Sequence, residues 1–222
     1  MILHDAGYVV RSANSNTHYF ESGAYPAWTR LNAIRGFPDQ PPGHGVEPHY
    51  HDNDEIWLFT QGAGEVWLDG VCHSWDANSV IYTPMGVVHR YQAFTASEVV
   101  AVVTPLERLR RAAHIYPEES GPPLPTSPGF VVRGHENTGP LRARGDRCPL
   151  SEFRTIIFAA GERCAVGTAD RHEHWLVLAG SIELTVRQVR VELAPGDLAQ
   201  IQAGTDRAIV SPAGGRVALI GE

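Results

Sequence analysis

Short runs of alternating apolar and polar residues, or of several apolar residues in succession, recur along the first half of the chain. Most of these runs end at glycine, proline, asparagine or aspartate, which are the residues that turns favour. Runs of this length between turn signals predict β-strands, and their regular recurrence is typical of an all-β sandwich or barrel. The strands predicted in this half are residues 28–34, 55–61, 64–68, 79–83, 89–94 and 98–104.

The middle of the chain interrupts this pattern. Residues 105–115 are predicted to form one short helix that begins at a proline. The proline-rich residues 117–129 can neither pair within a sheet nor continue a helix, so we interpret them as an extended linker. We therefore expect an N-terminal domain over residues 1–116 and a C-terminal domain over residues 130–222. In the second domain, strands are predicted to start near Phe130, Phe153, Trp175, Ser181, Gln188, Asp197, Arg207 and Arg216.

The second half of the chain repeats the first at one offset of 118 residues, without a gap. A repeat of this length predicts a duplicated fold. Glycines that recur at turn positions indicate backbone with positive φ, and Asn78 opposite Gly196 fits because asparagine tolerates the left-handed region. The matching pairs are Gly43 and Gly161, Glu55 and Glu173, Trp57 and Trp175, Leu58 and Leu176, Gly62 and Gly180, and Gly86 and Gly204.

Composition excludes several function classes. Apolar residues make up 43% of the chain and charged residues 19%, which is ordinary for a globular protein. A net charge of −7 disfavours nucleic acid as a partner, because phosphate binding needs clustered positive charge. All 18 basic residues are arginine, so Schiff-base and pyridoxal-type chemistry, which needs a lysine amine, is excluded.

The cysteines and the N-terminal sequence indicate the compartment. Cys72, Cys148 and Cys164 are odd in number and irregularly spaced, so they predict reduced thiols and neither a disulfide framework nor a zinc ribbon. We find no signal peptide and no apolar run long enough to span a membrane. The expected location is the cytoplasm, without a membrane partner.

Four residues of the first half have the types and the spacing of a metal site. His49 and His51 alternate along a predicted strand and therefore share a face, and the turn composition of residues 52–54 returns Glu55 to the same pocket. A second turn, at Pro84 and Gly86, delivers His89 from a distant strand. A single histidine is more often structural, but four such groups in this arrangement predict that one divalent metal ion is bound.

The equivalent positions of the second half have lost these ligands. The offset carries His49 to Gly167, His51 to Ala169 and His89 to Arg207, so only Glu173 is kept. We predict that this half keeps the barrel without the metal, and that Arg207 forms a salt bridge with Glu173. His172 and His174 flank Glu173, so strand alternation predicts that they face outward as surface histidines.

These motifs resemble those of the cupin superfamily. The residues from Gly43 to Gly62 match the first cupin motif at every fixed position, and Pro84, Gly86 and His89 match the second, which departs from the pattern only at Asn78 and Ala93. The resemblance implies a bicupin, with two tandem jelly-roll β-barrels in one chain. It further implies that the matched histidines and glutamate hold Fe, Mn, Ni, Co, Cu or Zn, and that the protein forms a homodimer or a higher homo-oligomer.

Ligand chemistry narrows the choice of metal. A mixed set of imidazole and carboxylate suits first-row divalent ions, and four protein ligands leave two positions open on an octahedral ion. Fe(II) is therefore our first choice and Mn(II) the second, because zinc is more readily satisfied by a tetrahedral site.

Strand alternation predicts the remaining pocket residues. Glu47, Trp57, Tyr82 and Tyr91 each lie two residues from a motif position and are expected to face inward near the metal. Trp57 and Tyr91 would form substrate-binding walls, although aromatic residues also simply fill small barrels. Glu47 or Tyr82 would transfer a proton, and Arg30 would pair with Glu47 or bind substrate.

Three function classes follow from such a site. The first is an Fe(II)-dependent oxygenase, leaning to a dioxygenase, that acts on a small oxygen-bearing substrate. The alternative is a metal-dependent isomerase, epimerase or lyase that uses the ion as a Lewis acid. The third is a non-catalytic protein that binds or senses a small molecule through its metal.

Overall fold

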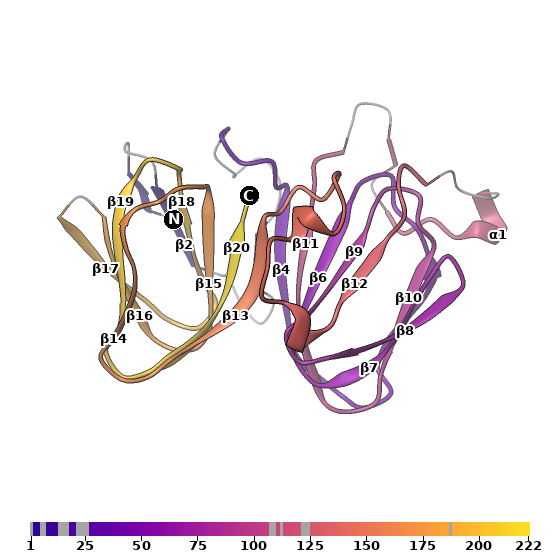
Figure 1. The fold of residues 1–222 in the computed structure, drawn as a ribbon, viewed down its shortest axis with the longest axis horizontal. Helices are drawn as coiled ribbons and strands as arrows, with labels where there is room; N and C mark the ends of the chain where they lie inside the picture. Colours follow the sequence, from indigo (N-terminus) through magenta and orange to yellow (C-terminus); the bar gives the residue numbers. More distant parts are fainter. Residues whose placement is uncertain are drawn as a thin grey trace. The chain divides into compact units, whose positions relative to one another are not determined.

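The computed structural model describes residues 2–4, 8–12, 18–20, 27–106, 110–111, 113–120, 125–186 and 188–222 (Figure 1). Strands dominate these residues, as predicted. The helical elements among them are one short α-helix, α1 (Pro117–Ser120), and two 3-10 turns, η1 (Gly134–Glu136) and η2 (Leu141–Ala143). The predicted all-β class is confirmed.

The chain divides into two compact units, each built on two antiparallel sheets. We call residues 30–149 together with β3 (His18–Phe20) the N-terminal barrel, and residues 150–222 together with β1 (Ile2–His4), β2 (Tyr8–Ser12) and residues 27–29 the C-terminal barrel. Each barrel combines a six-stranded with a four-stranded sheet (Figure 1).

In the N-terminal barrel, apolar side chains of the two sheets enclose the core. Phe59 and Trp75 stack at its centre with ring centroids 3.8 Å apart, and both are almost completely buried. The six-stranded sheet has the order β12 (Phe130–Val132), β9 (Ser79–Thr83), β6 (Glu55–Gln61), β11 (Ser97–Val103), β4 (Ala33–Gln40) and β3 (His18–Phe20). The four-stranded sheet has the order β5 (Gly45–His49), β10 (His89–Ala93), β7 (Ala63–Leu68) and β8 (Val71–Asp76).

The C-terminal barrel repeats this plan around a core that contains Trp175 and Phe158. Its six-stranded sheet has the order β1 (Ile2–His4), β2 (Tyr8–Ser12), β18 (Asp197–Ile201), β15 (Glu173–Gly180), β20 (Gly215–Gly221) and β13 (Glu152–Phe158). Its four-stranded sheet has the order β14 (Glu162–Thr168), β19 (Asp206–Ser211), β16 (Ile182–Val186) and β17 (Val189–Leu193).

The offset of 118 residues holds in three dimensions. Strands β9 and β18 begin at Ser79 and Asp197, which are 118 positions apart, and each takes the same place in its sheet. The turn residues behave as predicted: Asn78 has φ 66° and Gly196 has φ 90°. Gly62, with φ 99°, also needs to be small, because a Cβ there would lie 2.8 Å from the carbonyl oxygen of Ala96.

The contact-based units differ from the predicted domain boundaries of 1–116, 117–129 and 130–222. Strand β2 pairs with β18 in the C-terminal barrel, whereas β12, from the second half of the chain, pairs with β9 in the N-terminal barrel. β2 and β12 therefore occupy equivalent places: each pairs with a strand from the opposite half of the sequence, β18 or β9. A linear pattern shows that a strand exists but not which sheet edge it completes.

The predicted helix over residues 105–115 is wrong for its described part. Residues 105, 106, 110, 111 and 113–115 are not helical, and the others lie outside the described residues. Ile115 instead forms an antiparallel bridge with Tyr50, in which each backbone N–H donates to the other's carbonyl at 3.0 Å. The described helix, α1, begins at Pro117 within the expected linker.

Some strands were not predicted because they present few apolar residues. β8 and β14 are mostly exposed or half-buried along their length. The predicted strand over residues 28–34 starts only at Ala33. These elements are edges or outer faces, where alternation is weak.

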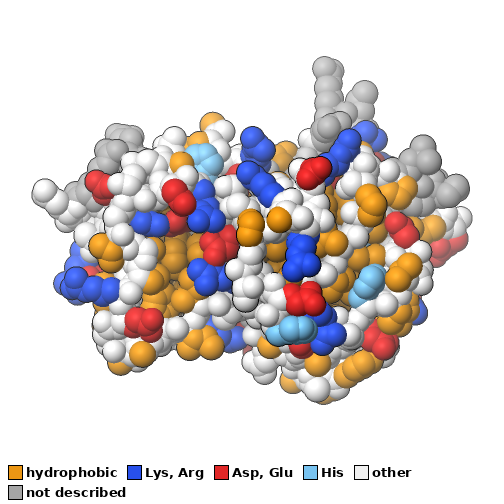
Figure 2. Space-filling model, in the orientation of Figure 1, with side chains coloured by type: hydrophobic (Ala, Val, Ile, Leu, Met, Phe, Trp, Pro, Cys, Tyr) orange, Lys and Arg blue, Asp and Glu red, His pale blue; other side chains and the backbone are white. Residues whose placement is uncertain are grey.

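Charged side chains of both signs are interspersed over the face shown in Figure 2. No helix within the described ranges has the length and apolar character needed to cross a membrane. The cytoplasmic location and the homo-oligomer stay predictions.

Candidate metal centre

The four predicted ligands of the N-terminal barrel converge. His49 ends β5, His51 lies in the following loop, Glu55 begins β6 and His89 begins β10. His49 and His89 are directly opposed in the ladder between β5 and β10. One potential ligand atom from each of the four residues lies within 4.8 Å of the others.

Backbone carbonyls orient two of the imidazoles. His49 Nδ1 lies 2.6 Å from the carbonyl oxygen of Glu47, and His89 Nδ1 lies 2.9 Å from that of Val87. A ring nitrogen that donates in this way leaves Nε2 as the free lone pair, which is how proteins fix metal-binding histidines.

Asp54 joins the turns of the two motifs. Its Oδ1 accepts a hydrogen bond of 2.8 Å from the backbone N–H of Met85, and its Oδ2 accepts one of 2.9 Å from the Tyr82 hydroxyl. The N–H of Gly86 donates to the carbonyl of His51 at 2.9 Å. The loop that carries His51 is therefore held against the turn that precedes His89.

The contacts inside the cluster fit a bound cation. Glu55 Oε2 lies 3.2 Å from His51 Nε2 and 3.7 Å from His89 Nε2. Both of these nitrogens are buried without a hydrogen-bond partner, and such groups are rare in native proteins unless something else satisfies them. A divalent ion coordinated by the cluster would satisfy both nitrogens.

The charge state of the cluster also suits a metal. Burial, reinforced by the neighbouring imidazoles, lowers the pKa of His49 to about 3. Burial opposes ionisation of Glu55, but its contacts with His51 and His89 hold its pKa well below the usual value. A neutral imidazole and an ionised carboxylate are the forms that bind a cation, and this donor set is one that first-row divalent ions accept.

Trp57 and Tyr91 lie inside the barrel beside the cluster, as expected. The Trp57 ring lies 5.1 Å from that of His89 and 5.3 Å from that of Tyr91, and both aromatic residues are buried. The Tyr91 hydroxyl donates to Gln40 Oε1 at 3.1 Å, and burial raises the pKa of Tyr91 to about 12. Their part in substrate binding stays a prediction.

Glu47 does not face inward, contrary to prediction. Between the pairs His89–His49 and Tyr91–Val46 the register shifts, so β5 contains one more residue than β10 over this stretch. Such a bulge reverses the alternation of side chains. Val46 consequently packs on the core, whereas Glu47 is exposed.

Tyr82 also lies away from the cluster, and the part of Arg30 in substrate binding stays a prediction. In the ladder between β6 and β9, Trp57 opposes Ile81, so Tyr82 lies on the opposite face of the sheet from Trp57. Tyr82 is buried there against Phe130, and burial raises its pKa above the usual range. Arg30 is exposed and precedes β4, outside any described strand.

Two further residues lie near the cluster and were not selected from the sequence. His114 stacks on His49 with ring centroids 4.1 Å apart. Arg35 lies on β4, on the face that lines the barrel interior. His114 was not selected because residues 105–115 were expected to form a helix. Arg35 was not selected because the predicted strand ended at residue 34.

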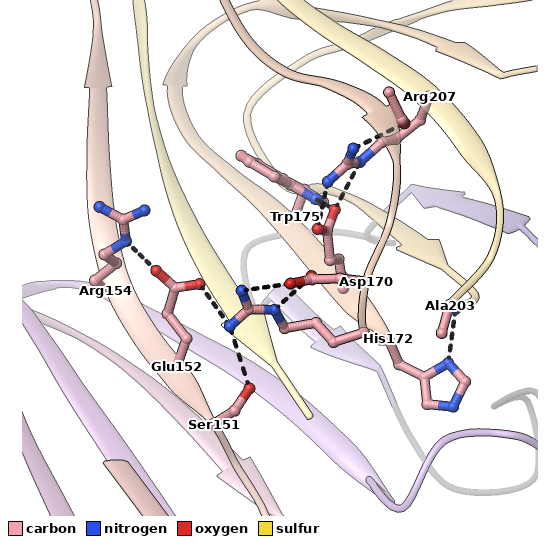
Figure 3. A network of polar contacts seen from close by, with 11 residues as sticks. Ser151, Glu152, Arg154, Asp170, His172, Trp175, Ala203 and Arg207 are labelled. Carbon is pink, nitrogen blue, oxygen red and sulfur yellow. Dashed lines mark hydrogen bonds and ion pairs between the residues drawn. The ribbon is translucent and has the colours of Figure 1, made fainter. Parts of the chain in front are cut away.

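In the C-terminal barrel the predicted ion pair replaces the metal (Figure 3). Arg207 Nη2 lies 2.6 Å from Glu173 Oε1, and Arg207 Nε donates to Glu173 Oε2 at 3.1 Å. Trp175 Nε1 donates to the same carboxylate at 3.0 Å, and Arg207 Nη1 donates to the carbonyl of Gly167 at 2.9 Å. The salt-bridge prediction is confirmed, and the described part of this barrel holds no cluster of metal-ligand side chains.

His174 is buried, so its prediction as a surface histidine is wrong. It does alternate with Glu173, but Gln200, Glu222 and Trp28 cover its side of the sheet. Its Nε2 lies 2.6 Å from Glu222 Oε1 and its Nδ1 lies 3.0 Å from Gln200 Nε2. His172 is half-buried and stacks on Trp28. Residues distant in sequence provide this cover, so alternation alone could not indicate it.

Comparison with known proteins agrees with this architecture. Residues 39–105 match the family described as Cupin domain. Oxalate decarboxylase from Bacillus subtilis, in a study of its Mn(II) centres, has TM-score 0.66 at 16% identity, over 99% of this chain and 78% of that chain. A putative glyoxylate induced protein from Pseudomonas aeruginosa has TM-score 0.56 at 13% identity, over 98% of this chain and 90% of that one.

A curated relative shares part of the sequence. Dimethylsulfoniopropionate lyase DddW from Ruegeria pomeroyi is 36% identical over 56 residues, which are 25% of this chain and 37% of the lyase. The chain thus spans well under half the length of that relative. The structural likenesses, at 13–16% identity, establish the tandem-barrel fold over the whole chain and leave the reaction open.

Proposed function

We propose that this chain, which belongs to the cupin superfamily and carries two tandem cupin barrels, is a metal-dependent lyase acting on a small oxygen-bearing substrate. The observation that carries the proposal is the convergence of His49, His51, Glu55 and His89, in which the buried Nε2 atoms of His51 and His89 face the Glu55 carboxylate and have no hydrogen-bond partner. These residues would hold one divalent ion, for which we favour Fe(II) and next Mn(II).

A bound ion would supply Lewis-acid polarisation of a substrate oxygen. The protein's own residues would orient the substrate and exclude water from it. Trp57 and Tyr91 form a buried aromatic surface beside His89 that suits both tasks. The Tyr91 hydroxyl, kept protonated by its raised pKa, can hold a hydrogen bond to a substrate oxygen in place of its bond to Gln40.

Two comparisons favour bond cleavage over oxygenation. Among the similar proteins, the curated relative is named a lyase and the Bacillus structure a decarboxylase, and both names denote removal of a fragment from a small acid. The sequence alone inclines to an oxygenase. The water-excluding aromatic surface beside His89 suits an oxygenase as well, so it remains the second candidate.

One experiment separates the two candidates. The full chain would be purified without oxygen, its metal content measured, and portions loaded with Mn(II), Fe(II) or Zn(II). Each portion would be assayed against oxalate, dimethylsulfoniopropionate, catechols, β-diketones and α-keto acids, while an oxygen electrode records consumption. Product formation without oxygen supports the lyase, and stoichiometric oxygen consumption refutes it in favour of the oxygenase. Failure to retain any divalent ion refutes both.

A further inference from the structure

Arg35 projects into the barrel that holds the metal ligands. Residues directly opposed across neighbouring strands share a face of the sheet. Ala101 on β11 opposes both Trp57 on β6 and Arg35 on β4, and Trp57 and Ala101 belong to the interior core. Arg35 therefore continues this interior row.

The adjacent interior row contains a metal ligand. Val103 opposes both Glu55 and Ala33. Glu55 and Ala33 each lie two residues before Trp57 and Arg35 on the same strands, so the two rows are neighbours on the interior face of the sheet. Arg35 is two strands away from Trp57, or about 10 Å. Ala101, between them, has a small side chain, so Trp57 and Arg35 face the same region of the barrel interior above β11.

His114 approaches the same space from the loop after β11. It immediately precedes Ile115, which pairs with Tyr50 in the antiparallel bridge. Neighbours of a bridged pair lie together on the opposite face from that pair, so His114 lies on the side of His49 and His51. Its ring stacks on His49 at 4.1 Å and 22°, and lies 5.2 Å from that of His51.

The segment that carries His114 is anchored. Arg111 Nε lies 3.0 Å from Asp52 Oδ2, its Nη2 donates to Asp52 Oδ1 at 3.2 Å, and its backbone N–H donates to Asp52 Oδ2 at 3.0 Å. The Arg111 guanidinium also lies 5.6 Å from the centre of the Tyr50 ring. The segment is thus fixed beside the strand and loop that provide His49 and His51.

His114 and Arg35 are electrostatic neighbours. Burial and the neighbouring His51 lower the pKa of His114, and the positive charge of Arg35 is a smaller contribution in the same direction. His114 retains an exposed part, whereas His49 is buried, so His114 stands at the rim of the site. The rim of the metal cluster therefore carries the His114 imidazole, and the Arg35 guanidinium faces the same barrel interior.

We propose that Arg35 and His114 bind the carboxylate of the substrate at the metal centre, so that the enzyme selects small carboxylic acids. A guanidinium presents parallel N–H donors that match the two oxygens of a carboxylate, and an imidazole adds one further donor. This inference rests on the proposed function only in requiring that the centre hold a metal ion.

The test measures binding, so it does not depend on a known reaction. The full chain, loaded with Mn(II), is titrated with propionate, with propionamide as the neutral analogue, and with inorganic phosphate. Binding at the centre is followed by the change in water-proton relaxation. We expect propionate to bind the wild type and Arg35→Met to weaken it roughly tenfold or more, the loss typical of a charge-assisted hydrogen bond. Propionamide should bind weakly and equally to both proteins.

Matched variants isolate the effect. Arg90→Met removes the same charge from the outer face of β10, where Arg90 stacks on Trp67, and should leave propionate binding unchanged. Arg35→Gln provides a second substitution, should Arg35→Met fail to fold, as judged by circular dichroism. His114→Leu should weaken propionate severalfold with metal content unchanged, and His114→Asn, which keeps a donor, should weaken it less.

Several results would overturn the inference. They are wild-type affinity for propionate in the folded Arg35 variants, equal binding of propionamide, or tighter binding of phosphate. A wild-type protein that holds stoichiometric Mn(II) and binds no propionate refutes this inference alone. A wild-type protein that holds no metal refutes the proposed function as well, and the metal assay distinguishes the two failures.

Discussion

Removing the positive charge of Arg207 should destabilise the C-terminal barrel strongly. The Arg207 and Glu173 side chains are 9% and 6% exposed, so the substitution Arg207→Met would leave the Glu173 carboxylate buried without its charged partner. Breaking a buried pair from one side costs about 3–5 kcal/mol, because the remaining charge is uncompensated. We expect the lower end, about 3 kcal/mol, because Trp175 Nε1 still donates to the Glu173 carboxylate.

The double variant tests the cause. Replacing both members, in Arg207→Met with Glu173→Leu, removes the stranded charge and should recover most of the lost free energy of unfolding. Arg190→Met is the control, because Arg190 pairs with Glu183 at the surface with 72% of its side chain exposed and should cost below about 1 kcal/mol.

Urea unfolding of the metal-free full chain, followed by circular dichroism and tryptophan fluorescence, measures these differences. A loss below about 1 kcal/mol in Arg207→Met, equal to that of the surface control, would contradict the reasoning from burial. So would a double variant that is no more stable than the single one.

Three further predictions concern the N-terminal barrel. His51→Ala should abolish retention of the metal, as measured by elemental analysis. The control His135→Ala, at a side chain that is 70% exposed, should retain the metal. A His51→Ala protein that still holds its full metal content would contradict the site. Burial opposes ionisation of Asp76, but its contacts with Arg133 and Ser79 lower its pKa from 3.8 to about 2. The stability that the ionised Asp76 contributes is present above pH 3.8 and is lost as the pH falls towards 2. Asp76→Asn should therefore lower the free energy of unfolding by about 1 kcal/mol at pH 7, a value reduced because the side chain is partly exposed, and by nothing near pH 2. Urea unfolding midpoints at the two pH values would show this difference. Gly62→Ala should lower the free energy of unfolding by about 2 kcal/mol or more, because the new Cβ would lie 2.8 Å from the carbonyl oxygen of Ala96. The control Gly70→Ala, which places its Cβ in open space at a similar φ, should lower it by about 1 kcal/mol. Equal losses of the two variants in thermal unfolding would contradict a cost from the close approach at Gly62.

The metal ligands could be predicted from the sequence because local geometry decides their positions. His49, His51 and Glu55 are joined by one short loop, and the turn at Pro84 and Gly86 aligns His89 opposite His49. The repeat was equally readable, since glycine and asparagine at positive φ mark the same turns in both halves. The loss of ligands in the second copy predicted the pairing of Arg207 with Glu173, because two opposite charges in one small barrel must meet.

Alternation predicted the inward positions of Trp57 and Tyr91 but failed wherever the ladder was irregular. The bulge in β5 displaced Glu47 from the interior, and Pro48, a residue type that sheets accept at edges and bulges, is the only sign of it in the sequence of this stretch. Tyr82 was misplaced because its assigned parity was counted across the turn at Pro84, where the strand had already ended.

The sequence by itself therefore determined the fold class, the duplication and the four residues of the candidate metal cluster, because motif spacing and turn chemistry act over a few residues. Only the tertiary structure decided which strands complete each sheet, that Gln200, Glu222 and Trp28 bury His174, that Arg35 faces the barrel interior, and that His114 stacks on His49. Each of these features depends on contacts between segments distant in sequence, and the free energy of such contacts leaves no periodic pattern along the chain.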